Sequence, residues 1–272
     1  MSQWQKRAKW TATASLNNTS RTLAHVAEIL GHDEDAQIYD ELADKVADAY
    51  CSVLTDGNGK LDNEFQTGYV LPLYLNMFPE DVRGNAVNHL VKLIEDNDYC
   101  IGTGFPGTPY ILFALADNGH EDVAYRMLLN AKCPSWLYEV DMGATTIWER
   151  WDGLDANGEC PIGDDGTDLM ISYNHYASGS VGAFLYQRVA GIEATEAAYR
   201  KFRVKPVPGG GLTWAKAHID TPYGRVGSDW SINDGHFSIT VEIPVGTTCE
   251  LVLPDGTTMQ LSNGVHTATC EI

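Results

Sequence analysis

The chain has 272 residues, of which 44% are hydrophobic, so it is long enough for one large domain or for a large and a small one. Lys and Arg total 18 against 37 Asp and Glu, and the formal net charge of -19 repels phosphate backbones and anionic membranes. We therefore expect neither nucleic acid nor a membrane as a partner.

The six cysteines are scattered, without a CxxC pair and without histidines at metal-ligand spacing. We expect reduced thiols and no metal site. The start of the chain, MSQWQKRAKW, is not followed by the apolar core of a signal peptide, and no run of about 18 apolar residues occurs. The sequence as given favours a soluble protein of the cytoplasm.

Two kinds of helical segment alternate over the first 200 residues. Residues 11–30, 69–78 and 109–116 suit inner helices, and the last two stretches are apolar on nearly every side. The other segments carry apolar residues at helical spacing on one face only, which is typical of outer helices. These outer helices are expected to begin near Glu34, Glu80 and Glu121.

The alternation predicts stacked helical hairpins of roughly 40–46 residues each. A further inner helix is expected over 176–190. Turns from inner to outer helix are short, whereas the turns from outer to inner helix are long, at 55–64, 96–106 and 132–175. Because turns of one kind share one rim of such an array, we expect the functional site on the rim of the long turns.

The hydrophobic period changes to two after about residue 200. Short alternating segments are broken there by PGGG, TPYG, NDG, PDG and SNG, which predicts an antiparallel β-sandwich. One such segment should turn its apolar side chains to a single face, namely Phe237, Ile239, Val241 and Ile243. The prediction is a mainly α chain with a helical domain over 1–200 and a C-terminal β domain over 201–272.

One carboxylate, Glu149, lies between two tryptophans in the stretch PSWLYEVDMGATTIWERWD at 134–152. Sugars present apolar faces that stack on indole, and their hydrolysis needs a carboxylate to activate water. The stretch therefore suits a sugar site. Taken alone it fits packing better, with Trp148 and Trp151 as core anchors and Glu149 paired with Arg150.

Several motifs in one order resemble the C-terminal half of the bacterial α-L-rhamnosidase family: TGFPGTPYILFALADNGHEDVAYRMLL, GATTIWERWDG and SYNHYASGSVGAFLY. The stretch RVKPVPGGGLTWAKAHIDTPYGRVGSDW is similar to the terminal domain of that family. Linked motifs are more specific than any single one. The resemblance covers nearly the whole chain and implies part of an (α/α)6 toroid followed by a β-sandwich. It also implies release of terminal α-L-rhamnose with inversion, without a cofactor.

The resemblance assigns roles to individual residues. Glu149 matches the glutamate of the TTxWE motif, which is the catalytic base of the family, and His175 matches a histidine that contacts the sugar. The alternative for His175 is a buried, hydrogen-bonded side chain at the start of the inner helix. Three tryptophans occupy matching aromatic positions, but the sequence does not say which of them face sugar: Trp136, Trp148 and Trp151.

Thr103 and Phe105 match a family loop on the same rim, and we expect both to contact substrate. The alternative is that Thr103 or Thr108 caps the helix that follows, since threonine is a common residue at the N-terminus of a helix.

An inverting glycosidase needs a general acid about 6.5–9.5 Å from the base. In the family this acid lies upstream in an acidic, arginine-containing motif, and no stretch of this chain matches that motif. Four other carboxyl groups near the rim look solvated, and none is persuasive: Glu64, Asp98, Glu139 and Asp141. Residues 1–200 supply roughly four of six hairpins, so we expect a missing N-terminal portion or a second chain to complete the site.

The leading interpretation is a glycosidase acting on a rhamnose-containing glycan or glycoside. One alternative is a non-catalytic carbohydrate-binding or assembly fragment that keeps the tryptophans and lacks turnover. Another is a different α/α-toroid glycosidase, trehalase-like or glucosidase-like. None of the three requires a cofactor or a metal.

Overall fold

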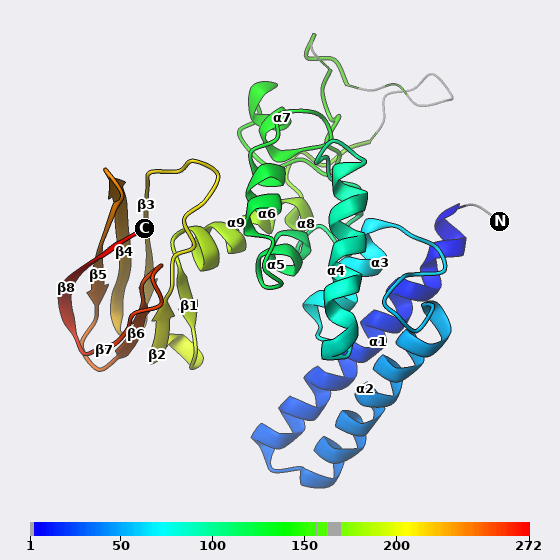
Figure 1. Cartoon of the computed structure of the whole chain (residues 1–272), viewed down its shortest axis with the longest axis horizontal. Helices are drawn as coiled ribbons and strands as arrows, with labels where there is room; N and C mark the ends of the chain where they lie inside the picture. Colours follow the sequence, from blue (N-terminus) through cyan, green and yellow to red (C-terminus); the bar gives the residue numbers. More distant parts are fainter. Residues whose placement is uncertain (1–2, 156, 161, 163–169) are drawn as a thin grey trace. The chain divides into compact units, whose positions relative to one another are not determined.

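A computed structural model describes residues 3–155, 157–160, 162 and 170–272. It forms two compact units, Met1–Gly179 and Ser180–Ile272 (Figure 1). The first unit is built of helical hairpins and the second is mostly β-sheet. The predicted fold class, helical hairpins followed by a β domain, is therefore confirmed.

Three helical hairpins form most of the first unit. The pairs are α1 (Gln3–Leu30) with α2 (Asp33–Leu54), α3 (Gln66–Tyr74) with α4 (Glu80–Glu95), and α5 (Ile111–Ala116) with α6 (Glu121–Leu128). The first helices of the pairs also contact one another, α1 with α3 and α3 with α5, so they are the inner layer. The outer helices begin within one residue of the three predicted glutamates.

Sequence explains why each helix takes its layer. All residues of α5 and all of α3 except Tyr74 are buried, in keeping with their largely apolar composition. The outer helix α2 buries a single stripe, Ala43, Val46, Tyr50 and Leu54. Each outer helix also carries two or three acidic residues in its first turn, where a negative charge is stabilised by the helix dipole.

The predicted long turn at 132–175 contains a short helix that the sequence analysis did not anticipate, α7 (Trp136–Asp141). Ser135 caps it, because its Oγ accepts a hydrogen bond of 3.2 Å from the Tyr138 amide. Residues 156, 161 and 163–169 of this turn lie outside the described residues. The predicted helix at 176–190 consists of three pieces: α8 (Tyr176–Gly179), α9 (Val181–Phe184) and a π-helical turn, η1 (Leu185–Val189).

The second unit contains two four-stranded sheets. One has the order β1 (Ile192–Ala194), β2 (Lys201–Val204), β6 (Thr248–Val252), β7 (Thr258–Leu261), with a short 3-10 turn, η2 (Ala197–Tyr199), between β1 and β2. The other has the order β3 (Trp214–Thr221), β4 (Gly224–Asn233), β5 (His236–Ile243), β8 (Gly264–Glu271). Neighbouring strands are antiparallel except β2 and β6, which run parallel.

The alternation predicted for β5 is confirmed, since its apolar side chains are at most 3% exposed. Residues before Lys201 already belong to this unit. The Trp230 indole donates to the Val189 carbonyl at 2.8 Å, and Ser228 Oγ donates to the Ala190 carbonyl at 2.7 Å. The β unit therefore starts upstream of the change in hydrophobic period. None of the helices in the described part of the chain is long and apolar enough to cross a membrane.

Candidate functional site

The segment that carries Glu149 is paired with the segment that carries His175. The Glu149 amide donates to the Ser172 carbonyl at 2.8 Å, and the His175 amide donates to the Ile147 carbonyl at 2.9 Å. The Thr146 hydroxyl adds a bond to the Tyr173 carbonyl. Glu149 and His175, which the sequence assigned to one site, thus lie on adjacent segments whose backbones are hydrogen-bonded to each other.

The Glu149 carboxylate is half-buried and fixed through one oxygen. Its Oε2 accepts a hydrogen bond of 2.9 Å from the Ser172 amide. Among the described residues no donor contacts Oε1, so this oxygen can accept a hydrogen bond from water. Arg150 does not neutralise Glu149 as the packing interpretation requires. Its guanidinium is bidentate on Asp152, at 3.0 and 2.9 Å, and this hydrogen bonding lowers the pKa of Asp152.

The three tryptophans have different environments. Trp136 is 4% exposed and Trp148 is 3% exposed, so these rings have little surface for a sugar and act as packing anchors. The Trp136 indole donates to the Ser178 carbonyl at 2.9 Å, and Trp148 packs edge-to-face on Tyr173. Trp151 is half-buried, with its ring edge-to-face against Trp136 at 5.5 Å. Of the three, Trp151 is the ring that can present a face to a ligand.

Phe105, His175 and Tyr176 form a column of stacked rings. The ring centroids of Phe105 and His175 are 4.3 Å apart, and those of His175 and Tyr176 are 5.1 Å apart. The Ala177 amide donates to His175 Nδ1 at 3.3 Å, which steadies the imidazole at the start of α8. Phe105 is 44% and Tyr176 is 83% exposed, and both line a cleft of about 240 Å³ whose other walls include Leu71 and Tyr110.

Thr103 and Thr108 are buried and bonded to each other, with 2.8 Å between their hydroxyl oxygens. Thr108 Oγ1 also donates to the Gly104 carbonyl at 3.0 Å. Neither threonine caps α5, whose N-cap residue is Tyr110 and has no side-chain cap. The threonine pair instead closes the turn that presents Phe105.

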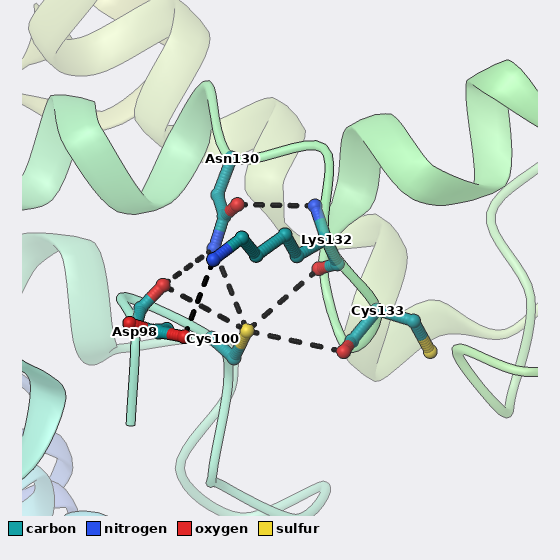
Figure 2. A network of polar contacts seen from close by, with 5 residues as sticks. All are labelled: Asp98, Cys100, Asn130, Lys132 and Cys133. Atoms are coloured by element: carbon teal, nitrogen blue, oxygen red, sulfur yellow. Dashed lines mark hydrogen bonds and ion pairs between the residues drawn. The ribbon is translucent and has the colours of Figure 1, made fainter. Parts of the chain in front are cut away.

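Two of the long turns, 96–106 and 132–175, are bonded together (Figure 2). Asn130 Nδ2 donates to the Asp98 carbonyl at 3.0 Å, and the Lys132 ammonium forms an ion pair of 3.2 Å with the Asp98 carboxylate. Cys100 Sγ contacts the Lys132 and Cys133 carbonyls at 3.8 Å, and the Ile101 amide donates to the Pro134 carbonyl at 2.9 Å. The turn before Phe105 and the turn before α7 therefore share one rim, as predicted.

Glu139 is the functional candidate that sequence reasoning misjudged. It was expected to be solvated, but it is 0% exposed on α7. Its Oε2 accepts a hydrogen bond of 3.0 Å from the Trp148 amide, and its Oε1 is buried with no partner among the residues that the structure describes. Burial raises the pKa of Glu139 to about 7, although the bond from Trp148 opposes the rise. The sequence did contain an indication of this burial, because Trp136 and Glu139 are three residues apart and would share one face of a helix.

The other three carboxyl groups are solvent-accessible, as expected. Asp98 is paired with Lys132, and Asp141 is exposed. Glu64 accepts a hydrogen bond from the Tyr69 hydroxyl at 3.1 Å and lies 3.6 Å from the Lys60 ammonium. Within the part of the chain that the structure describes, no group of His, Cys, Asp and Glu side chains is arranged to hold a metal ion.

Comparison with known proteins extends the resemblance. Residues 2–189 match the family model of the bacterial alpha-L-rhamnosidase 6 hairpin glycosidase domain, and residues 191–268 match that of the bacterial alpha-L-rhamnosidase C-terminal domain. An alpha-L-rhamnosidase of Streptomyces avermitilis is 40% identical over 243 residues, which cover 89% of this chain and 23% of the relative.

Two solved structures have the same fold over nearly the whole chain. Native alpha-L-rhamnosidase from Aspergillus terreus superposes with a TM-score of 0.88 at 37% identity, over 94% of this chain and 30% of that one. The Streptomyces avermitilis alpha-L-rhamnosidase complexed with L-rhamnose also gives 0.88, at 36% identity, over 96% of this chain and 26% of that one. The chain thus spans about a quarter of the length of the relatives it matches.

Proposed function

The chain belongs to the bacterial α-L-rhamnosidase family, and on that premise we propose that it forms the base-bearing part of an enzyme that releases terminal α-L-rhamnose. One observation carries the proposal. The Glu149 carboxylate is half-buried, fixed through Oε2 by the Ser172 amide, and held beside the segment that carries His175.

In the proposed reaction, Glu149 Oε1 accepts a proton from water as the water oxygen attacks the anomeric carbon. The bond from that carbon to the aglycone oxygen breaks on the opposite face, and a general acid protonates the leaving oxygen. The configuration at the anomeric carbon is therefore inverted. Fixing one carboxylate oxygen by a backbone amide restricts the direction from which the other oxygen receives the water proton.

We place the sugar against the aromatic groups on the rim. The exposed face of Phe105 and the half-buried ring of Trp151 offer stacking surfaces for apolar sugar faces, and His175 offers a hydrogen-bonding edge. Thr103 acts through the turn that presents Phe105 and is not itself a contact in this proposal.

The general acid, in this proposal, comes from outside these 272 residues. Glu139 is oriented to the Trp148 amide and is wholly buried, and the other three candidates are solvated or ion-paired. The apolar side chains that α1 exposes, among them Leu16, Val26 and Ile29, would pack against the same additional part of the enzyme.

The test compares three proteins: this chain, a chimera in which the chain replaces the matching segment of the Streptomyces avermitilis relative, and the chimera with Glu149→Gln. We expect the chimera to hydrolyse an aryl α-L-rhamnoside with inversion, and the isolated chain to be slower by roughly 10²-fold or more, because it lacks acid catalysis and substrate positioning. Turnover by the isolated chain at the rate of the chimera would contradict the proposal. So would an unchanged rate in the Glu149→Gln chimera.

A further inference from the structure

A fully buried carboxyl group, that of Glu139, is bonded to the backbone next to the proposed catalytic base. Glu139 projects from α7 and accepts the Trp148 amide hydrogen at 3.0 Å, so it bonds the backbone of the residue that precedes Glu149. The proposed reaction does not use Glu139, because none of its surface is exposed to a substrate.

The Glu139 bond completes the backbone anchoring of this segment. Downstream, the Glu149 amide is bonded to the Ser172 carbonyl, and the Glu149 carboxylate is bonded to the Ser172 amide. Upstream, the Ile147 carbonyl accepts the His175 amide. The Trp148 amide lies between these bonds along the chain, but it donates to a different segment, the Glu139 side chain on α7.

A carboxyl group is a costly choice for this position. Among the described residues, Glu139 Oε1 has no hydrogen-bond partner, and a buried unpaired polar atom destabilises a fold. Packing alone would be served better by an apolar side chain of similar length. What a glutamate adds is an acceptor that reaches from α7 to the Trp148 amide.

We propose that Glu139 is a positioning residue that holds the Trp148–Glu149 backbone so that the Glu149 carboxylate stays on the Ser172 amide. Its importance for turnover rests on the proposed function of Glu149, but the backbone contact it makes can be tested without turnover. The Ser172 amide is the informative reporter, because its acceptor is Glu149 and not Glu139.

The experiment measures backbone amide exchange by NMR in the isolated ¹⁵N-labelled chain. Glu139→Met keeps the length of the side chain and removes the acceptor, whereas Glu139→Gln keeps a carbonyl acceptor. We expect Met to accelerate exchange of both the Trp148 and the Ser172 amides by roughly tenfold, and Gln to restore most of the protection. Glu149→Ala should accelerate exchange at Ser172 and leave Trp148 protected.

Asn17→Leu is the matched control. Asn17 is 2% exposed and donates to the Ala43 carbonyl at 2.7 Å, so the change removes another buried hydrogen bond of the same unit. It should leave the Trp148 and Ser172 amides protected. If Met gives a poorly folded chain, Glu139→Asp replaces it, because its shorter side chain withdraws the acceptor while keeping a carboxyl group.

Protection of Ser172 within twofold of the wild type in the Met or Asp variant would overturn the inference. An equal acceleration at all amides of the unit would also overturn it, because Glu139 would then be a general packing residue. A Glu149→Gln chimera of unchanged activity would instead refute the proposed function. The amide-exchange experiment would still decide, independently, whether Glu139 holds the Trp148–Glu149 backbone.

Discussion

At the scale of single residues, Glu139 couples folding to pH. Burial raises its pKa from an ordinary 4.5 to about 7, so between these values the folded chain binds more protons than the unfolded chain. The free energy of unfolding contributed by this group is therefore greatest below about pH 4.5 and is lost as the pH rises through 7. The full loss amounts to about 3 kcal/mol.

We expect Glu139→Gln to abolish this dependence. Urea titrations of both proteins at pH 5 and pH 8 would measure it. The wild type should lose about 2.5 kcal/mol more than the variant between the two conditions, because a small part of the loss has already occurred at pH 5. Taking the difference between the proteins cancels the contribution of every other titrating group. Equal losses in the two proteins would show that Glu139 has an ordinary pKa.

Trp148 and Trp151 have opposite predicted roles although they are three residues apart. Trp148 is 3% exposed, so Trp148→Ala should lower the free energy of unfolding by about 3–5 kcal/mol. Trp151 is half-buried, so Trp151→Ala should cost less than half of that and should raise the KM of the chimera for an aryl rhamnoside. Calorimetry and steady-state kinetics measure the two effects. A change in KM without loss of stability for Trp148→Ala would contradict this division of roles.

At the scale of elements, Gly191 is the junction between the π-helical turn and β1. Its φ is +83°, and a Cβ at this position would lie 2.2 Å from Pro206 N and 2.5 Å from the Lys205 carbonyl carbon. The Lys205 amide also donates to the Gly191 carbonyl at 2.9 Å, so the two backbones cannot separate without losing that bond. Only glycine permits so close an approach.

Gly191→Ala should therefore destabilise the β unit by roughly 3 kcal/mol or more. Gly256→Ala is the matched control, because Gly256 has a similar φ of +87° and a Cβ added there would meet no atom within 4 Å, so it should lose only about 1 kcal/mol. Thermal unfolding followed by near-ultraviolet circular dichroism compares the two. Similar losses of stability in the two variants would mean that the positive φ alone, without a steric clash, explains why position 191 is a glycine.

Sequence periodicity predicted the elements whose burial follows from their own residues. The outer helices carry acidic first turns and a single apolar stripe, and β5 alternates strictly, so each could be recognised from a short window. The parallel pairing of β2 with β6 depends on contacts between residues about 47 positions apart along the chain, as in the Phe202–Cys249 pair, and no local pattern records it. The short helix α7 was missed because it lies inside a stretch read as one long turn.

The candidate site was predictable to the same extent. The motif places Glu149 and the segment of His175, and the structure joins the two by backbone hydrogen bonds. The motif could not show that Trp136 and Trp148 are buried, because the same sequence of tryptophan and carboxylate occurs both in protein cores and in ligand clefts. The environment of Glu139 was hidden for a related reason: its hydrogen-bond donor is the Trp148 amide, nine residues away, and not one of its own neighbours.

At the scale of the whole molecule, the chain is a helical unit that carries Glu149 and a β unit with its own core. Its relatives are about four times longer, and the described residues hold a fixed, half-buried Glu149 carboxylate and a cleft lined by the rings of Phe105 and Tyr176. In the proposed reaction, Glu149 activates the attacking water. Removing the carboxylate should stop the reaction with water and spare a nucleophile that needs no deprotonation.

Azide is such a nucleophile, so the most direct test is the Glu149→Ala chimera assayed on an aryl α-L-rhamnoside with and without sodium azide, with an NMR readout of the product. We expect turnover to fall by roughly 10²-fold or more without azide and to rise again with it. The product should be β-L-rhamnosyl azide, because azide attacks from the side that water occupied. Turnover to rhamnose at the rate of the unmodified chimera, or azide rescue that gives the α-azide, would contradict the assignment of Glu149 as the base.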